Sequence, residues 1–167
     1  MPKVNPNRSA TDIAVSLLAR REHTAAELGD KLRRRGIPEE EIAAVLGRLT
    51  DTGVIDNERA ALIIIRGELR KRPLGRMRLI SKLRQRRVPN EIITRCLSEF
   101  DETWEKEQCI RAVDNWIRMN SRSGQWKEAL TRHLRSRGFQ WEPIREALKC
   151  AGTPDIADGE IRLDDDE

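Results

Sequence analysis

Apolar residues recur along this chain in a pattern that repeats every 51 residues. Six positions of the pattern hold apolar residues in three successive copies, namely Leu28, Leu79 and Leu130; Leu32, Leu83 and Leu134; Ile42, Ile93 and Ile144; Leu46, Leu97 and Leu148; Ala10, Ala61 and Ala112; and Ile37, Val88 and Phe139. Chance rarely aligns so many positions, and a fixed period is typical of proteins built from stacked structural repeats. The sequence therefore predicts three copies of a unit of about 50 residues.

Within the first copy, the spacing of apolar residues predicts three helices. Over residues 10–18 they recur three and four positions apart, as on the buried face of a helix. A second helix is expected to begin at Thr24, because Thr24 and Glu27 form the T-x-x-E pattern of a capping box. Gly36 is expected to end it, since glycine readily adopts the left-handed conformation that closes many helices. Pro38 suits the first turn of a third helix, where its missing N–H has no intrahelical partner.

The second and third copies follow the same plan, and no stretch alternates as a strand would. Asp56 is expected to cap a helix that runs to Arg72, and Pro73 with Gly75 separates it from the next helix. Five further helices are expected over residues 76–87, 89–100, 101–117, 126–137 and 141–150.

We therefore expect an all-α protein in which three tandem three-helix repeats form an elongated, curved array. Each short repeat has too small a core to be stable alone, so neighbouring repeats must pack together. The expected divisions are an N-terminal arm over residues 1–9, three-helix repeats over 10–55, 56–100 and 101–150, and an acidic tail over 151–167. The tail lacks helical periodicity and is expected to be disordered.

The net charge of +4 conceals two regions of opposite sign. Residues 151–167 hold seven acidic residues and one arginine, so residues 1–150 carry a net charge of +10. Of the 32 basic residues, 25 are arginines, whose planar guanidinium suits phosphate and carboxylate groups. This charge predicts an anionic partner, which is either nucleic acid or an acidic protein surface.

The middle helix of each copy carries the strongest candidates for contacting such a partner. Arg33, Arg84 and Arg135 share one position of the repeat and are expected to point into solvent, and the position two residues later is also arginine in every copy. These outward charges have no matching acids in the pattern, which favours a partner-binding face over an ordinary solvated surface. The predicted face consists of Arg33, Arg35, Arg76, Arg78, Lys82, Arg84, Arg86, Arg87, Arg135 and Arg137.

Little in the sequence points to catalysis, a cofactor or a metal ion. It has neither a P-loop or Rossmann phosphate-binding motif nor an HExxH motif, and its two histidines have no evident carboxylate or nucleophile partner. The three cysteines lack CxxC spacing, so neither a zinc site nor a disulfide framework is expected. The acids between Asp51 and Asp56 are better explained as caps and turns than as a hydrolytic pair. We expect a protein that is not an enzyme and that needs no cofactor.

All four tryptophans, Trp104, Trp116, Trp126 and Trp141, lie in the third copy. Their spacing favours anchors packed between helices. The alternative is a platform on which nucleic acid bases stack, which would require exposed rings.

The chain has no segment suited to a membrane or to export. Its longest apolar block, Ala60–Ile65, is far shorter than the roughly 18 residues of a spanning helix. The first residues lack the apolar stretch of a secretory signal. We expect a cytoplasmic monomer.

Three segments of the chain carry an ordered set of motifs. One runs from Leu18 to Ile37, a second runs from Leu49 to Ala60, and a third begins at Gly75. The residues of these motifs are Leu18-Ala19-Arg20-Arg21-Glu22-His23-Thr24, Glu27-Leu28, Lys31-Leu32, Arg35-Gly36-Ile37, Leu49, Gly53-Val54-Ile55-Asp56-Asn57, Arg59-Ala60, and Gly75 with Leu79, Leu83 and Arg86. In this order they resemble the signature of the RecX family of bacterial regulatory proteins. The resemblance is dense over residues 10–100 and stays in register to residue 148.

The chain departs from the family pattern at three positions. Val54 stands where the family usually has an aromatic residue, Asn57 replaces the second of two aspartates, and Arg76 replaces a proline. Arg20, Arg21 and Asp56 occupy signature positions, and we interpret them as residues that orient helices.

The resemblance implies a modulator of the RecA recombinase that lies in the groove of the RecA–DNA filament. It would inhibit RecA ATP hydrolysis, strand exchange and filament extension. Such a protein would act in DNA repair, in recombination and in regulation of the SOS response. The basic face would contact acidic RecA surface or, more weakly, the phosphates of single-stranded or double-stranded DNA. Two alternatives stay open, namely a sequence-nonspecific nucleic-acid-binding protein and a helical scaffold without a nucleic acid partner.

Overall fold

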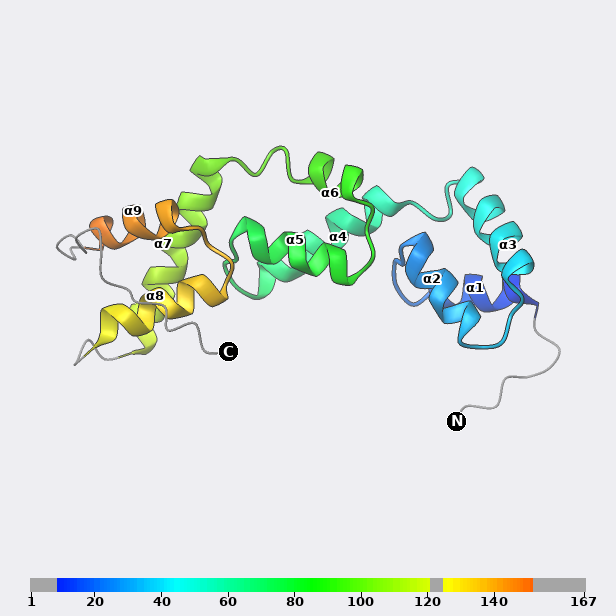
Figure 1. The fold of residues 1–167 in the computed structure, drawn as a ribbon, viewed down its shortest axis with the longest axis horizontal. Coiled ribbons are helices and arrows are strands. Elements are labelled where there is room, and N and C mark those ends of the chain that lie inside the picture. The colour runs from blue at the N-terminus through cyan, green and yellow to red at the C-terminus, as the bar shows by residue number, and fades with distance from the viewer. Residues whose placement is uncertain (1–8, 121–124, 152–167) are drawn as a thin grey trace, which may run out of the picture.

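Three successive bundles of three helices make up residues 9–120 and 125–151, the part of the chain that this computed structural model describes (Figure 1). No strand occurs within these ranges. The predicted arm before Ser9, the predicted loop over residues 121–124 and the predicted tail beyond Ala151 lie outside the described residues. The helices are α1 (Ala10–Leu18), α2 (Ala25–Arg33), α3 (Glu39–Asp51), α4 (Asn57–Lys71), α5 (Arg76–Gln85), α6 (Asn90–Cys96), α7 (Glu102–Met119), α8 (Trp126–Ser136) and α9 (Trp141–Cys150).

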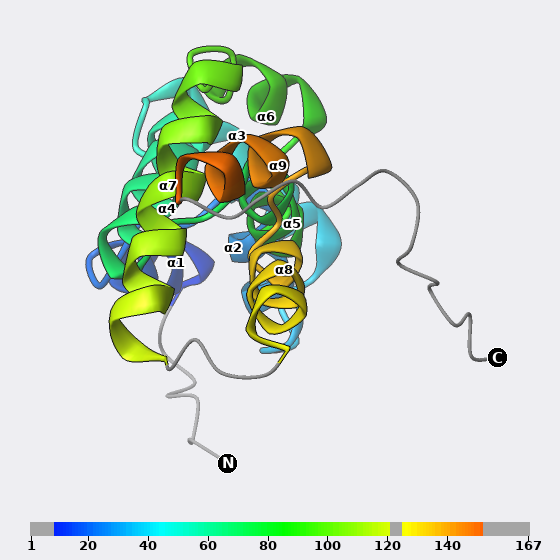
Figure 2. The same ribbon diagram turned by 90° about the vertical axis from the view of Figure 1, so that its left-hand side faces the viewer.

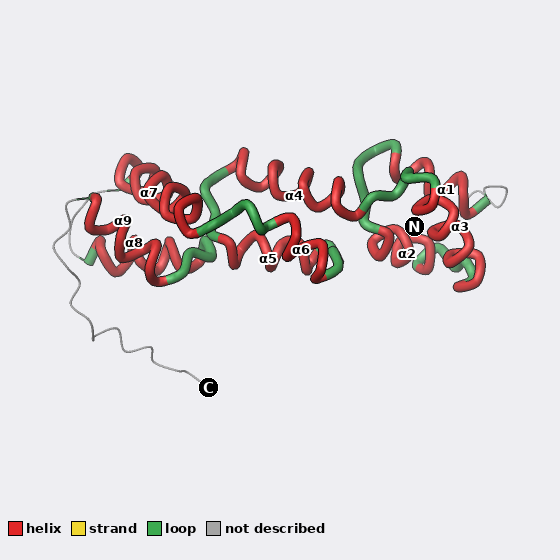
Figure 3. The backbone as a smooth tube through the Cα atoms, turned by 90° about the horizontal axis from the view of Figure 1, so that it is seen from above, coloured by secondary structure: helices red, strands yellow, loops and turns green. Residues whose placement is uncertain are grey.

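The bundles follow one another along a single long axis, so the described chain is an elongated array (Figures 1 and 3). The expected all-α architecture of tandem three-helix repeats is confirmed. Seen along the axis, the first helices of the bundles lie on one side, the middle helices on a second and the third helices on a third (Figure 2).

Each bundle has its own apolar core at the repeated positions. Leu28, Leu79 and Leu130 are at most 1% exposed, and each belongs to the core of a different bundle. Burying one leucine side chain contributes roughly 1.5–3 kcal/mol. The 51-residue period is therefore a period of equivalent buried environments.

Caps predicted from the sequence begin several helices. Thr24 accepts a hydrogen bond from the Glu27 backbone N–H at 3.1 Å, and the Glu27 carboxylate accepts one from the Thr24 N–H at 3.4 Å. Asp56 caps α4 by accepting from the N–H groups of Glu58 and Arg59. The expectation for Pro38 is wrong by one residue, because Pro38 is the extended cap before α3 and lies outside its first turn.

Two helices of the second bundle end earlier than predicted. Helix α5 ends at Gln85, because Arg87 adopts a left-handed backbone with φ of 53°. Gly36 and Gly138 hold the corresponding place in the other bundles, with φ of 77° and 82°. Helix α6 ends at Cys96, and Arg76 Nη1 then donates to the carbonyl oxygens of Leu97 and Phe100 at 2.8 and 2.9 Å.

The second and third bundles meet at a direct backbone contact, here called the second joint, between Gly75 and Gly138. The Gly75 N–H donates to the Arg137 carbonyl at 3.0 Å. A Cβ atom on Gly75 would lie 2.3 Å from the Gly138 carbonyl oxygen, and one on Gly138 would lie 2.3 Å from the Arg78 nitrogen. Neither position accommodates a side chain without moving the backbone, so two glycines are required for this packing.

A buried carboxylate strengthens the second joint. Glu105 on α7 is 5% exposed and accepts a hydrogen bond from the Arg76 N–H, at the start of α5, at 3.1 Å. The Gln140 backbone N–H, before α9, also donates to it. Burial raises the pKa of Glu105 above its ordinary value despite these hydrogen bonds. This side chain joins three helices from two bundles.

Candidate partner-binding face

The middle helices α2, α5 and α8, which carry most of the predicted basic face, follow one long side of the array (Figures 2 and 3). Their apolar stripes point into the three cores, which leaves the opposite stripe of each helix to solvent. The helices that carry most of the predicted basic face therefore lie along the same side of the protein.

Four of the predicted arginines are exposed on or beside these helices and are available to a partner. Arg78, Arg84 and Arg135 form no hydrogen bond or ion pair through their side chains within the described residues. The Arg35 guanidinium donates to the Lys31 carbonyl at 2.9 Å and has no acidic partner in that part of the chain. The guanidinium groups of Arg78, Arg84 and Arg135 keep their full capacity to bind carboxylate or phosphate oxygens, and Arg35 keeps the donors that it does not use on the Lys31 carbonyl.

Arg33 occupies the same repeat position as Arg84 and Arg135, but it is neutralised locally. Its Nη1 lies 2.8 Å from Asp30 Oδ1, and its Nε lies 3.0 Å from Glu39 Oε2. The hydrogen bonds that Arg33 donates to the Glu39 carboxylate raise the pKa of Arg33 and lower the pKa of Glu39. An external anion must therefore compete with two carboxylates at this position.

Arg86 and Arg87 bind the first bundle through ion pairs. Arg86 donates from Nε to Glu27 Oε1 and from Nη2 to Glu27 Oε2, the latter at 3.1 Å. Arg87 Nε lies 3.0 Å from Asp30 Oδ2. The expectation that the basic face lacks matching acids is therefore wrong for Arg33, Arg86 and Arg87. Asp30 lies three residues before Arg33 on α2, so the sequence could have shown that pair. Glu39 comes from the following helix, and the partners of Arg86 and Arg87 are distant in the sequence, which the pattern of a single helix cannot show.

These ion pairs belong to a polar contact between the first and second bundles, here called the first joint. Arg59 Nε lies 2.9 Å from Glu22 Oε1, and Asn57 Oδ1 accepts from the Ala25 N–H at 2.9 Å. The Thr24 hydroxyl donates to the Arg86 carbonyl at 2.9 Å. Charged and capping groups thus hold the first joint, whereas backbone packing and the buried Glu105 carboxylate hold the second.

His23 lies beside the first joint and has a carboxylate neighbour that the sequence did not reveal. Its side chain is 2% exposed, and its Nδ1 lies 3.5 Å from Glu27 Oε2. Burial, followed by the nearby Arg21 charge, lowers the pKa of His23. The ring is neutral at physiological pH and contributes packing to this region.

The remaining predicted bases are engaged inside the protein to different degrees. Arg76 is half-buried and holds the carbonyl groups after α6. Arg137 is half-buried and donates from Nη1 to the Pro73 carbonyl at 3.4 Å. Lys82 Nζ lies 3.9 Å from Glu68 Oε2, and Glu68 is closer to Lys71, at 2.8 Å. The first two arginines stabilise the protein at these positions.

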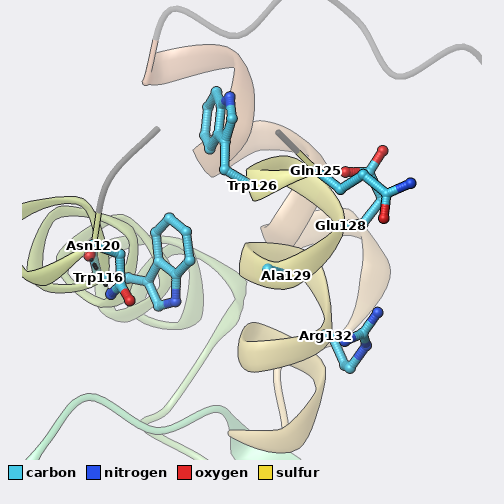
Figure 4. A pocket seen from close by; sticks show the side chains of 7 residues that line it. All are labelled: Trp116, Asn120, Gln125, Trp126, Glu128, Ala129 and Arg132. Carbon is cyan, nitrogen blue, oxygen red and sulfur yellow. Dashed lines mark hydrogen bonds between the residues drawn. The ribbon is translucent and has the colours of Figure 1, made fainter. Parts of the chain in front are cut away.

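Three of the four tryptophans act as helix anchors, whereas Trp141, the first residue of α9, is exposed and does not fit that expectation. Trp104 packs against the second core and meets Phe100 edge to face at 4.6 Å, while Trp116 and Trp126 pack against the third core. Trp116 and Trp126 also border a pocket of about 340 Å³ between α7 and α8, whose other lining residues are Asn120, Gln125, Glu128, Ala129 and Arg132 (Figure 4). In Figure 4 the Trp126 ring points away from Arg132. For Trp104, Trp116 and Trp126, the half-buried rings favour anchoring over base stacking.

The described residues contain no group of three or more His, Cys, Asp or Glu side chains placed to hold a metal ion. Burial raises the pKa of the Cys109 thiol to about 12, so this thiol stays protonated and unreactive at neutral pH. Among the same described residues, no helix is both long and apolar enough to cross a membrane.

Comparisons with known proteins agree on one family. A family model described as RecX, first three-helix domain, matches residues 10–49. The regulatory protein RecX of Chlorobaculum tepidum is 37% identical over 142 residues, which cover 84% of this chain and 87% of the relative. The regulatory protein RecX of Pelodictyon phaeoclathratiforme is 32% identical over 154 residues, which cover 90% and 94%.

Solved structures share the fold. The crystal structure of RecX from Lactobacillus salivarius matches with a TM-score of 0.76 over 86% of this chain and 94% of that chain, at 18% sequence identity. A second crystal structure of regulatory protein RecX matches with a TM-score of 0.72. With relatives above 30% identity along most of its length, the chain belongs to the RecX family of regulatory proteins.

Proposed function

We propose that this protein binds the RecA–DNA filament in its groove and inhibits RecA ATP hydrolysis, strand exchange and filament extension. It does so as a monomer and without catalysis of its own, in the cytoplasm. RecA is the main partner in this proposal, and DNA phosphates are secondary contacts.

The observation that supports this proposal is an elongated array whose middle helices present unpaired arginines along one side. Arg84 and Arg135 occupy equivalent repeat positions on α5 and α8, Arg78 also lies on α5, and Arg35 directly follows the end of α2 in the first bundle. A filament repeats its surface along its axis, so a repeated protein can contact successive subunits. Several weak contacts on one rigid chain then add through effective concentration.

The direct test is RecA ATPase activity on single-stranded DNA as this protein is added. We expect inhibition at concentrations well below those at which the protein binds bare DNA. Arg84→Glu should raise the concentration for half inhibition by about tenfold or more, because a charge-assisted hydrogen bond contributes about 1.5–3 kcal/mol. The matched control is Arg66→Glu, an exposed arginine on α4, on the side of the first helices, which changes the net charge equally. Equal inhibition by both variants would refute the placement of the face.

A sequence-nonspecific nucleic-acid binder is the second candidate, supported by the same exposed arginines. Its affinity for bare single-stranded DNA would fall steeply with salt, with a logarithmic slope set by the number of phosphates contacted. If ATPase inhibition and DNA binding share one concentration range and one salt slope, then DNA is the main partner and the RecA proposal fails.

A further inference from the structure

Each bundle carries an arginine at the same position of its middle helix, but the surroundings of that arginine differ between bundles. The Arg33 guanidinium lies 2.8 Å from Asp30 Oδ1 and 3.0 Å from Glu39 Oε2. Arg84 and Arg135, at the equivalent positions, form no ion pair within the described part of the chain. The difference must come from the residues that replace the two acids in the later copies of the repeat.

The first of these positions changes from an acid to a base along the chain. Asp30 is followed 51 residues later by Ser81 and another 51 residues later by Arg132. Arg132 lies three residues before Arg135 on α8, so the two side chains project from neighbouring points of one helix face. Both are exposed, and neither side chain forms a hydrogen bond or ion pair with another described residue. The third bundle therefore presents two unpaired guanidinium groups where the first bundle presents an internal ion pair.

The second position changes from an acid to an exposed indole. Glu39, which begins α3, is followed at the same spacing by Asn90 and then by Trp141, which begins α9. Trp141 is 36% exposed and belongs to none of the three apolar cores of the described bundles. Tryptophan and arginine are the side chains that most often carry the binding energy of protein interfaces. The core therefore does not explain this indole, whereas a partner surface would.

The turn between α8 and α9 repeats the turn between α2 and α3. The Gly36 N–H donates to the Arg33 carbonyl at 2.9 Å, and the Gly138 N–H donates to the Arg135 carbonyl at the same distance. The two glycines have φ of 77° and 82°, and the residue before each following helix is extended. Trp141 therefore leaves the backbone at the same place relative to Arg135 as the first residue of α3 does relative to Arg33.

We propose that Arg132, Arg135 and Trp141 form the strongest contact of this array with a partner protein, here called the third-bundle anchor. The partner surface carries two carboxylates beside an apolar patch. Two guanidinium groups one turn apart bind the carboxylates through charge-assisted hydrogen bonds, and the indole supplies apolar area that excludes water from them. The inference rests on the proposed function and deepens it, because it assigns the main contact with the RecA filament to the last bundle.

Two exposed neighbours favour a protein partner over a nucleic acid. Glu128 lies one turn before Arg132 on α8 and forms no ion pair with another described residue, so it would repel a phosphate backbone. Met77, at the equivalent position of α5, is 49% exposed and offers an apolar contact. A protein surface that combines charged and apolar groups accommodates both residues, whereas a row of phosphates accommodates neither.

The test compares equivalent positions of two bundles in the full-length protein. The readouts are inhibition of RecA ATPase activity on single-stranded DNA and binding of the labelled protein to the RecA filament. Arg135→Ser should raise the concentration for half inhibition by about tenfold, because unpaired guanidinium donors are lost from the interface. Arg33→Ser should raise it by only about twofold, because Asp30 and Glu39 already occupy this guanidinium.

Further variants test the other two residues of the anchor. Arg132→Ser should raise the concentration for half inhibition by about tenfold, whereas Arg66→Ser, at an exposed position of α4, should leave it unchanged. Trp141→Ala should also raise it by about tenfold, whereas Met119→Ala, at a position that is 86% exposed at the end of α7, should not. Urea unfolding midpoints that match the parent show that each variant is folded.

The outcomes separate this inference from the proposed function. A parent protein that neither binds the RecA filament nor inhibits its ATPase refutes the proposed function, and the inference with it. If the parent inhibits but Arg135→Ser weakens inhibition no more than Arg33→Ser, only the inference is wrong. If Arg132→Ser and Trp141→Ala weaken binding to bare single-stranded DNA by the same factor as inhibition, the anchor recognises nucleic acid and its assignment to a protein partner is overturned.

Discussion

Substitution of Gly75 by alanine offers the sharpest test of how the second and third bundles are joined. The added Cβ would lie 2.3 Å from the Gly138 carbonyl oxygen, 2.4 Å from the Gly138 carbonyl carbon and 2.5 Å from the Phe139 nitrogen. All three are backbone atoms, so no side chain can rotate out of the way. The φ of Gly75 is −78°, which alanine adopts freely, and the effect must therefore come from the contact alone.

The magnitude follows from what the shift would break. Overpacking at a close contact costs about 1–3 kcal/mol. Separating the backbones also weakens the hydrogen bond from Gly75 to Arg137, about 1 kcal/mol, and that from Arg76 to the buried Glu105 carboxylate, about 1.5–3 kcal/mol. Because the structure relaxes in part, we expect Gly75→Ala to lower the free energy of unfolding by about 3–5 kcal/mol.

Urea unfolding followed by tryptophan fluorescence measures this loss, since all four tryptophans lie between residues 104 and 141. The matched control is Gly67→Ala in α4, where a Cβ would meet no atom within 4 Å. Alanine is the better helix former, so the control should be more stable by about 0.5–1 kcal/mol. A Gly75→Ala protein with the parent's unfolding midpoint would show that the two bundles do not depend on this contact.

Three further substitutions test the joints. Glu105→Gln removes a carboxyl whose pKa in the folded protein is raised above the ordinary 4.5. The stability of the parent therefore falls as the pH rises from 4.5 through the raised pKa. Over that pH range, urea unfolding should show the variant gaining stability relative to the parent. Arg87→Gly removes about 1 kcal/mol of strain from the left-handed backbone, and it also removes the ion pair with Asp30. Added salt weakens that ion pair in the parent, so the stability of the variant relative to the parent should rise with salt concentration. Thr24→Ala removes both the cap of α2 and the hydrogen bond to the Arg86 carbonyl, and thermal unfolding should show a loss of about 1–2 kcal/mol.

Each of these has an outcome that contradicts it. A pH-independent difference between Glu105→Gln and the parent would mean that the carboxyl has its ordinary pKa in the folded protein. A salt-independent Arg87→Gly difference would show that the ion pair contributes nothing. Thr94→Ala, at an exposed position of α6, is the control for Thr24 and should change stability little; equal losses would exclude the role of the cap.

Local signals allowed most of the fold to be predicted from the sequence. The repeat period identified the core, and the Thr24 and Asp56 caps follow from hydrogen bonds between residues two or three apart. The contact between Arg86 and Glu27 joins residues 59 apart, and no periodicity signals such a pair. The left-handed turn at Arg87 was hidden because an arginine stands where the other copies have glycine.

The candidate face was only partly predictable for the same reason. Charge and register identified which helices carry exposed arginines, and Arg84 and Arg135 are indeed exposed. Whether a guanidinium is occupied depends on acids and carbonyl groups that other helices supply, as the carbonyl groups after α6 do for Arg76. Glu105 was missed because a charged residue inside an amphipathic helix gives no sign that a neighbouring bundle will bury it.

The polar character of the first joint has a consequence for how the chain is made. The first core draws only on residues 10–55, so it is complete as soon as that segment leaves the ribosome. The surface that later receives the second bundle consists of carboxylates and a capped helix start, which water solvates well. Nascent chains that wait for the rest of the polypeptide therefore expose little that would make them aggregate or require a chaperone.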